Sequence, residues 1–391
     1  MITQGEKSAA LKLAAQARGA DCAACPYKAQ PFVPCAGPPT AKLGFLGERP
    51  GRDEAEEMGP FKGQSGRIFH ELLRGIGQPA SGVFVDNAIA CWPGLGEPDK
   101  EELKKAERCC RPRATADRAG VAKLVPMGTL ALRSLGSLEN ITDVDSVPLV
   151  IPGVGEVFPV YHPANALPHR NPSMLRVLRQ QFSRVHEWQQ TSQFPLWELP
   201  PVITNLTHSE ETCIEVLTDL TGPRPIGLDV ETPMINEPLD WETKGRVLLN
   251  VGAARAEDKL AVCVDWLSSS QRLIDATIEL VESPTPKVMQ NGGFDARVFR
   301  WAEGVRVGNF AFDTMDAFRL LFPNLPAGLD AISAFLTRYP RWKDSFRAGR
   351  VEKGDYFAQA DAVARAVYCG HDSFVQAWLG DAMMQKMGMK L

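Results

Sequence analysis

Short apolar runs alternate with amphipathic stretches along the whole chain. In the first half the apolar runs fit strands at residues 42–48, 82–91, 122–128 and 156–163. In the second half they fit strands at residues 226–230, 246–254, 260–266 and 286–291. Stretches such as residues 65–77 and 363–379 place apolar positions on one face of a helix. Strands that alternate with helices predict α/β layers in both halves.

Residues 186–201 interrupt this pattern. The segment HEWQQTSQFPLWELPP ends a charged helical stretch and then breaks it with prolines, and a new strand pattern starts beyond it. The sequence therefore predicts two domains, residues 1–195 and residues 196–391.

Composition and charge narrow the class of protein. No apolar run is long enough to span a bilayer, and the N-terminus lacks the apolar core of a signal peptide, so we expect a location in the cytosol of the host cell. The net charge is −4, but residues 1–195 carry 23 Lys and Arg against 20 Asp and Glu, whereas the remainder carries 20 against 27. An acidic half can still bind DNA if its carboxylates hold divalent cations.

Two acidic motifs follow strands in the second half. Asp229 and Glu231 lie in the strand pattern IGLDVE, and the period of two puts both carboxylates on one face. KVMQNGGFD places Asn291 and Asp295 four residues apart after another strand. Each pattern alone is common and carries little weight.

A third motif lies in the predicted helix at residues 363–379. Tyr368 and Asp372 are separated by one helical turn and share a face, although such a pair is usually only a half-buried surface. Four carboxylates without clustered histidine or cysteine are hard oxygen ligands that suit Mg²⁺ or Mn²⁺ better than zinc. A pair of such ions hydrolyses phosphodiesters in many nucleases.

The ordered set DVE, NGGFD and YCGHD resembles the proofreading exonuclease domain of family A DNA polymerases, in its tyrosine-containing DEDD form, over about residues 201–391. The resemblance implies an RNase H-like fold that degrades single-stranded DNA from its 3′ end with two Mg²⁺ or Mn²⁺ ions. Tyr368 would position the attacking water. The metal ligands would be Asp229, Glu231, Asp295 and Asp372.

The same resemblance gives supporting roles to other residues. Asn291 and Phe294 would hold the substrate end, and Asp313 would hold either that end or the scaffold. Cys369 stands where relatives often carry asparagine, which we interpret as a packing difference. The chain stops soon after Asp372, so we expect any DNA polymerase partner to be a separate polypeptide. An inactive exonuclease fold retained for packing is the alternative.

Nine cysteines in a reducing compartment favour metal or cluster ligation over disulfides. Cys22 and Cys25 are separated by two residues, and Cys91 and the pair Cys109 and Cys110 follow. By cysteine count alone, zinc and a 4Fe–4S cluster are equally good interpretations.

The sequence between these cysteines separates the two alternatives. GERPGRDEAEEMGPFKGQSG (residues 47–66), VFVDNAIACWP (residues 83–93) and VYHPANAL (residues 160–167) occur in that order. Together they resemble family 4 uracil-DNA glycosylases over about residues 15–190. The resemblance implies an α/β/α sandwich with a structural 4Fe–4S cluster. Its ligands would be Cys22, Cys25, Cys91 and Cys110, the last preferred over Cys109 because Arg-Pro follows it; Cys35 would be a bystander.

In this resemblance Phe61 would stack on a flipped uracil and Asn87 would read its edge, because an amide both donates and accepts. His162 would donate to the departing base. Glu48 and Glu54 would orient water or stabilise the positive sugar. Two glycines would let the backbone approach the ligand closely, Gly47 and Gly51.

One position departs from the family. Arg49 stands where relatives have glycine or alanine, inside the loop that contacts base and water. A long, permanently charged side chain there could fill the pocket, grip a phosphate or change the accepted base. Two hypotheses therefore stay open. The protein is a metal-dependent exonuclease whose first domain recognises and excises uracil, or that domain is a non-catalytic DNA-binding module serving a separate polymerase.

Overall fold

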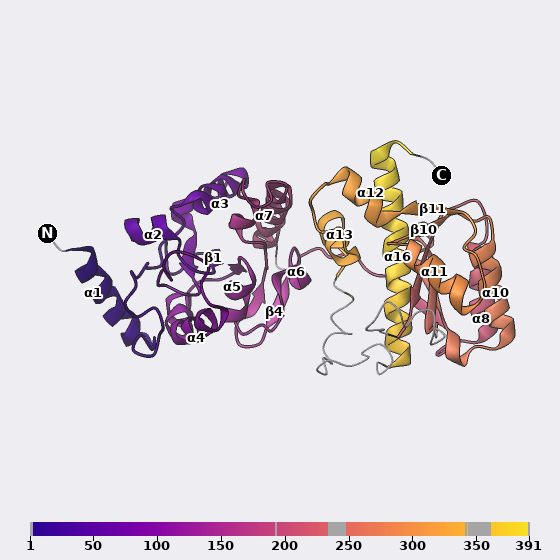
Figure 1. Ribbon diagram of the computed structural model, residues 1–391, viewed down its shortest axis with the longest axis horizontal. Coiled ribbons are helices and arrows are strands. Elements are labelled where there is room, and N and C mark those ends of the chain that lie inside the picture. The colour runs from indigo at the N-terminus through magenta and orange to yellow at the C-terminus, as the bar shows by residue number, and fades with distance from the viewer. Residues whose placement is uncertain (1–2, 192–193, 234–247, 341, 343–360, 390–391) are drawn as a thin grey trace. The chain divides into compact units, whose positions relative to one another are not determined.

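The computed structural model of the protein describes residues 3–191, 194–233, 248–340, 342 and 361–389 (Figure 1). The chain divides into two compact units, Met1–Pro195 and Leu196–Leu391. Each unit has its own sheet flanked by helices, which confirms the predicted α/β class. Within the described residues, no helix is both long and apolar enough to cross a bilayer.

The first unit is built on a five-stranded sheet with the order β2-β1-β3-β5-β4. The central strands pair in parallel, and only β4 at the edge is antiparallel to its neighbour. Because both faces of β1 are covered, its four residues are all buried and read as an apolar run. The strands are β1 (Gly44–Gly47), β2 (Phe84–Asn87), β3 (Leu124–Pro126), β4 (Leu149–Ile151) and β5 (Gly155–Val157).

Helices cover both faces of this sheet. Phe45 of β1 stacks on Phe182 of α7 at 5.4 Å and meets Phe69 of α3 edge-on at 5.1 Å. The next residue, Leu46, points to the opposite face and packs with Leu132 of α5. The unit is therefore an α/β/α sandwich. Its helices are α1 (Gln4–Ala17), α2 (Arg52–Glu57), α3 (Gln64–Gly75), α4 (Lys100–Asp117), α5 (Thr129–Ser134), α6 (Ile141–Val144) and α7 (Met174–Gln190), with short 3₁₀ helices η1 (Ala80–Gly82) and η2 (Pro163–Ala166).

The second unit is built on a six-stranded sheet with the order β11-β10-β7-β8-β9-β6. β8 runs antiparallel to β7 and β9, while β10 and β11 are parallel to β7. The expected strand at residues 246–254 appears as β8, and residues 246–247 lie outside the described residues. The strands are β6 (Val202–Thr204), β7 (Ile226–Glu231), β8 (Asn250–Arg255), β9 (Leu260–Asp265), β10 (Lys287–Met289) and β11 (Phe310–Asp313).

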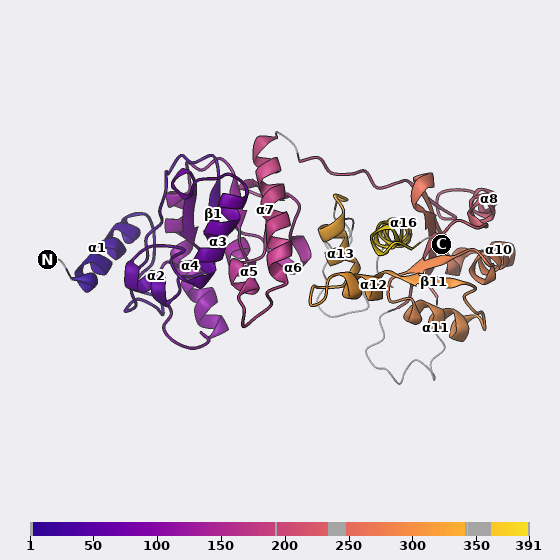
Figure 2. The ribbon, with the colours of Figure 1, turned by 90° about the horizontal axis from the view of Figure 1, so that it is seen from above.

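The helices of the second unit divide between the two faces of its sheet. α8 and α10 pack together over one face, whereas α16 lies along the other against β7, β8 and β9 (Figure 2). The helices are α8 (Glu210–Leu220), α10 (Gln271–Glu282), α11 (Gly293–Ala302), α12 (Thr314–Leu321), α13 (Leu329–Leu336) and α16 (Ala362–Met387), with 3₁₀ helices η3 (Ala256–Asp258) and η4 (Trp266–Ser268).

Two glycines allow α16 to lie directly on the sheet. A Cβ on Gly227 of β7 would be 1.9 Å from the carbonyl oxygen of Ser373. A Cβ on Gly252 of β8 would be 2.3 Å from the Ser373 hydroxyl and 2.7 Å from the carbonyl oxygen of Cys369. No other residue type fits here without moving the helix, so the glycines set how close α16 comes to β7.

Candidate active sites

The acidic residues of β7 face α16. The side chains of Asp229 and Glu231 are half-buried, and their carboxylate oxygens and the Cys369 sulfur all lie within 4.8 Å of one another. Gln376, further along α16, donates from Nε2 to Asp229 Oδ1 at 2.7 Å. The strand and the helix thus form one small polar site.

Two further carboxyl groups lie near this pair, but outside the group whose ligand atoms are within 4.8 Å of one another. Asp295, in the first turn of α11, is buried, and its Oδ1 accepts from the Val230 N–H between the two strand acids at 3.1 Å. Asp372 is buried on α16 and accepts from Trp342 Nε1 at 2.6 Å. Burial is the main cause that raises the pKa of Asp295 to about 8; backbone hydrogen bonds oppose this shift, and the charges of Asp313 and Asp372 contribute to it. A carboxyl group in this state releases its proton readily when a cation arrives.

Tyr368 is half-buried on α16, one turn before Asp372, as the predicted spacing requires. Cys369 packs against Cys263 and its thiol donates to the Asp229 carbonyl oxygen at 3.8 Å. The sequence indicated only a packing role for this cysteine, but its sulfur also lies within 4.8 Å of the Asp229 and Glu231 carboxylate oxygens. The sequence did contain a signal for this position of Cys369. Residues three apart share one face of a helix, so Cys369 could have been placed on the same face as Asp372.

The loop after β10 is held by the Asp313 carboxylate. The N–H groups of Asn291 and Gly292 donate to the Asp313 carboxylate at 3.2 and 2.9 Å, and Asp313 also caps α12. Asn291 is exposed with a left-handed backbone (φ 56°), and Phe294 packs half-buried against the core. Asp313 therefore supports the scaffold, and the Asn291 side chain is presented at the surface.

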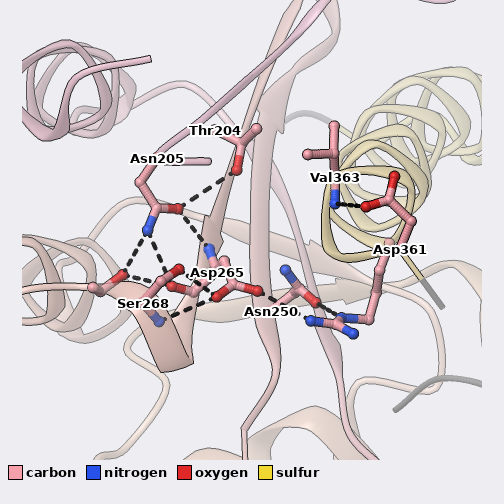
Figure 3. A network of polar contacts seen from close by, with 9 residues as sticks. Thr204, Asn205, Asn250, Asp265, Ser268, Asp361 and Val363 are labelled. Atoms are coloured by element: carbon pink, nitrogen blue, oxygen red, sulfur yellow. Dashed lines mark hydrogen bonds and ion pairs between the residues drawn. The ribbon is translucent and has the colours of Figure 1, made fainter. Parts of the chain in front are cut away.

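A buried polar network fixes the first turns of α16 (Figure 3). Arg365 donates to Asn250 Oδ1 at 2.6 Å and to Asp265 Oδ2 at 3.1 Å, while Asp361 caps the helix. Asn250 is the register partner of Glu231. The guanidinium thus ties α16 to the strands that carry the acidic site.

In the first unit, the residues expected to bind a base meet at the carboxyl ends of parallel strands. Gly47 of β1 and Asn87 of β2 are register partners. A Cβ on Gly47 would lie 2.4 Å from Asn87 Oδ1 and 3.0 Å from Phe61 Cζ. Ligands of open α/β sheets bind at this edge.

Glu54 holds the loop that carries Phe61. Its carboxylate accepts from the N–H groups of Gly51 and Phe61, the latter at 2.5 Å, and it is buried. These bonds support the left-handed backbone of Phe61 (φ 56°). Because both oxygens of Glu54 bind backbone donors, Glu54 is a positioning residue, and Glu48 is the remaining candidate for contact with water.

His162 is held in a defined tautomer. Its Nδ1 accepts from the Ala164 N–H at 3.1 Å, which leaves the proton on Nε2. Burial lowers the pKa of His162; Glu48 opposes this shift, and Arg49 adds to it. Glu48 itself accepts from the Leu130 N–H at 3.0 Å. The site therefore presents a neutral imidazole with a donating Nε2–H.

A buried arginine connects α4 to this site. Arg113 is fully buried and donates to both oxygens of Asp86 at 3.0 Å, to Asp117 at 2.9 Å and to the Asn87 carbonyl at 3.0 Å. Burial alone would lower the pKa of Arg113, but the carboxylates outweigh it, so the guanidinium stays charged.

Five cysteines gather beside α4. Cys25, Cys91 and Cys110 are buried together, with Cys22 and Cys109 packed against them. Burial raises the pKa of Cys25 to about 11 and that of Cys91 to about 12, so bare thiols here stay protonated. By contrast, the charged neighbours of Cys35 are Asp86, Asp117, Arg113 and Arg18 rather than other cysteines.

The chemistry of these side chains fits a metal centre. Thiolate sulfurs are soft ligands that hold zinc or an iron–sulfur cluster. The five cysteines of this cluster supply enough sulfurs for the four ligands of either centre.

Comparison with known proteins identifies the class of the first unit. Residues 34–183 match the family described as the uracil DNA glycosylase superfamily. The type-4 uracil-DNA glycosylase of Archaeoglobus fulgidus is 30% identical over 145 residues, which cover 35% of this chain and 72% of that protein. The type-4 enzyme of Sulfurisphaera tokodaii is 29% identical over 167 residues, covering 40% and 73%. The chain therefore belongs to the type-4 uracil-DNA glycosylase family through its first unit.

Solved structures of nucleases and a polymerase also resemble the chain. The POL domain of Pol1 from M. smegmatis, in complex with DNA primer-template and dNTP, shares 13% identity with a TM-score of 0.33, covering 48% of this chain and 28% of that one. Escherichia coli RNase D shares 15% identity with a TM-score of 0.34, covering 48% and 45%. Brucella melitensis NrnC with bound Mg²⁺ shares 19% identity with a TM-score of 0.32, covering 44% and 76%. At these values the similarities support no functional conclusion.

Replacing Asp295 by asparagine tests the electrostatics of the acidic site. The folded pKa of about 8 lies above the ordinary value of 3.8, so this carboxyl group stabilises the fold at low pH and loses that contribution as pH rises from about 4 to about 8. In EDTA, the unfolding free energy of wild type should therefore decrease relative to that of Asp295→Asn as pH rises. The difference should change by up to about 1.4 kcal/mol per pH unit in this range. Urea unfolding at several pH values measures it.

Asp275→Asn is the matched control, because Asp275 is an exposed acid on α10. Its pH dependence should follow that of wild type. A parallel pH dependence for Asp295→Asn would show that Asp295 is already ionised in the metal-free fold.

Proposed function

We propose that the second unit is a metal-dependent 3′–5′ exonuclease acting on single-stranded DNA ends, and that the first unit recognises and excises uracil from DNA. The observation that supports the nuclease proposal is the pair of β7 carboxylates beside α16. Asp295 of α11 accepts from the N–H between these two acids, and the charge of Asp372 on α16 acts on Asp295. Membership of the type-4 glycosylase family supports DNA as the substrate.

In the nuclease, Asp229, Glu231, Asp295 and Asp372 would hold two Mg²⁺ or Mn²⁺ ions. When bound, such ions activate water and stabilise charge on a phosphodiester. Tyr368 would hold the attacking water beside Asp372, one turn along α16. Gln376 keeps Asp229 oriented, and Asn291 and Phe294 would contact the strand end.

In the glycosylase, Phe61 would stack on the flipped base and Asn87 would hydrogen-bond its edge. The bond from the sugar carbon to the base nitrogen breaks, water adds to the sugar, and the base leaves with the bond's electron pair. The neutral His162 would donate from Nε2 to the base oxygen that gains negative charge. Glu48 would face the positive sugar and the water.

The cysteine cage would hold a 4Fe–4S cluster through Cys22, Cys25, Cys91 and Cys110. When bound, the cluster would replace the thiol protons that burial retains and would brace the loops around α4. Cys109 lies in the same cluster of side chains and is the alternative fourth ligand.

A second candidate function follows from Arg49. Relatives would carry a small residue at position 49. The charge of Arg49 contributes to the lowered pKa of His162. In this alternative the first unit binds DNA without excising a base and delivers the nuclease to a separate polymerase. Uracil release by the wild-type protein distinguishes the two functions.

The nuclease proposal predicts that Asp229→Ala abolishes degradation of 5′-labelled single-stranded DNA in Mg²⁺. The substitution removes a ligand from the acidic site, so the rate should fall to the level measured in EDTA. Tyr368→Phe keeps the carboxylates and should lose roughly 10²-fold through poorer positioning of water. Asp275→Ala, at an exposed acid, should leave the rate unchanged. Undiminished degradation by Asp229→Ala would defeat the assignment.

The glycosylase proposal predicts abasic-site formation in a uracil-containing oligonucleotide, measured in EDTA to silence the nuclease. His162→Ala should reduce the rate by about 10²- to 10³-fold, because the base then departs without this hydrogen-bond donor. His169→Ala, an exposed histidine nearby in sequence, is the control. Since the pKa of His162 is lowered, wild-type activity should not fall as pH rises from 6.5 to 8. No uracil release by wild type or by Arg49→Gly would favour the DNA-binding alternative.

The cluster proposal predicts a brown protein with absorbance near about 400 nm after anaerobic purification. Cys110→Ala should lose the iron, whereas Cys109→Ala and Cys35→Ala should keep it. The reverse result for the adjacent pair would make Cys109 the ligand. If the protein is colourless and contains zinc, the cysteines form a zinc site and the cluster proposal is wrong.

A further inference from the structure

A strongly basic cleft lies in the first unit between α4, α5 and the loop after α5. Its volume is about 620 Å³. Six of the residues that line it are cationic: Arg49, Lys100, Lys104, Arg108, Arg111 and Arg133. The unit as a whole has only a small excess of positive charge, so this concentration is local.

The acidic residues that line the cleft are already engaged. Glu107 is buried and accepts from Arg111 Nε at 2.7 Å. Glu48 accepts from the Leu130 N–H at 3.0 Å. Their charges cancel only part of the positive charge, so the cleft retains a surplus of cations.

Several of these cations are available to a ligand. In the part of the chain that the structure describes, Arg49, Lys100 and Arg108 make no hydrogen bond or ion pair through their side chains. Lys104 pairs with the exposed Glu101 at 2.6 Å, a contact that contributes little in water. A convergent set of unpaired cations with no internal partner is costly unless an anion binds there.

The cationic residues of α4 form a regular row. Lys100, Lys104 and Arg108 follow at intervals of four residues, so their Cα atoms are about 6 Å apart along one face. This spacing suits successive phosphates of a nucleic acid strand better than a single small anion. Such a row contributes to binding chiefly through release of counterions.

The cleft adjoins the proposed base-recognition site through the segment that follows β1. Glu48 and Arg49 line it, and they directly follow Gly47, which contacts Asn87 and Phe61. A strand that lies in the cleft would therefore pass the pocket expected to receive a flipped base. Arg49 stands at the junction of the two.

We propose that this cleft binds the backbone phosphates of the DNA strand whose base enters the neighbouring pocket, with Arg49 contacting the phosphate nearest that base. The proposal rests on the proposed function for its DNA substrate, but it requires no base excision. It assigns α4 a binding role in addition to its support of the cysteine cage.

The test measures binding of a fluorescent, uracil-free single-stranded oligonucleotide in EDTA over a series of salt concentrations. Lys100→Gln/Arg108→Gln removes two cations that have no internal partner. The slope of log K against log salt is negative, and its magnitude should decrease by about 0.7 for each phosphate that the protein no longer neutralises. The double variant should therefore show a decrease of roughly 1.4 in this magnitude. Lys42→Gln/Lys105→Gln removes two exposed cations that do not line the cleft and should keep the wild-type slope.

Two further arms keep the test decisive. Arg108 directly precedes Cys109, so Lys100→Gln/Arg108→Gln could also lose absorbance at about 400 nm. In that case Lys100→Gln/Lys104→Gln, which keeps Arg108, replaces it in the binding test. Inorganic phosphate at the same phosphate concentration should not displace the oligonucleotide. An unchanged slope in the cleft variants, an equal decrease in the control variant, or displacement by inorganic phosphate would overturn the proposal. Because no uracil is used, failure of base excision leaves this result independent.

Discussion

The second unit depends on holding like charges together. Asp229 and Glu231 repel each other when ionised, as do Asp295 and Asp372, and burial, the main cause of the raised pKa of Asp295, adds to this cost. The packing of α16 on the sheet opposes the repulsion. Gly227 lets the helix backbone touch the strand, and a separate buried ion pair fixes the first turns of the helix. These stabilising contacts therefore lie beside the acidic site rather than within it.

The first unit holds a buried positive charge, in contrast to the acidic groups of the second unit. The buried guanidinium of Arg113 is neutralised by Asp86 and Asp117, and it also holds the Asn87 carbonyl. Because Arg113 follows Cys110 by one helical turn, the cysteine cage and the base-recognition site share one rigid support. A shift of α4 would therefore be transmitted to Asn87 through Arg113.

One helix serves three purposes on different faces. The buried face of α4 carries Cys110 and Arg113, and its exposed face carries the cationic row that includes Lys100 and Arg108. α16 likewise combines support with function. Arg365 anchors the helix, and the following turns supply side chains to the acidic site. In both units a single long helix links structural support to the functional residues.

The sequence by itself determined the α/β class and the family of the first unit, because ordered motifs and strand–helix alternation are local properties of the chain. It missed three short strands, which show too few alternating positions to reveal a period: Leu149–Ile151, Val202–Thr204 and Phe310–Asp313. Only the tertiary structure decided which side chains meet. Gln376 contacts Asp229 across 147 residues, and Glu54 turned out to bind backbone N–H groups rather than to stand open to water. Such contacts follow from how closely helices approach strands, which no local pattern encodes.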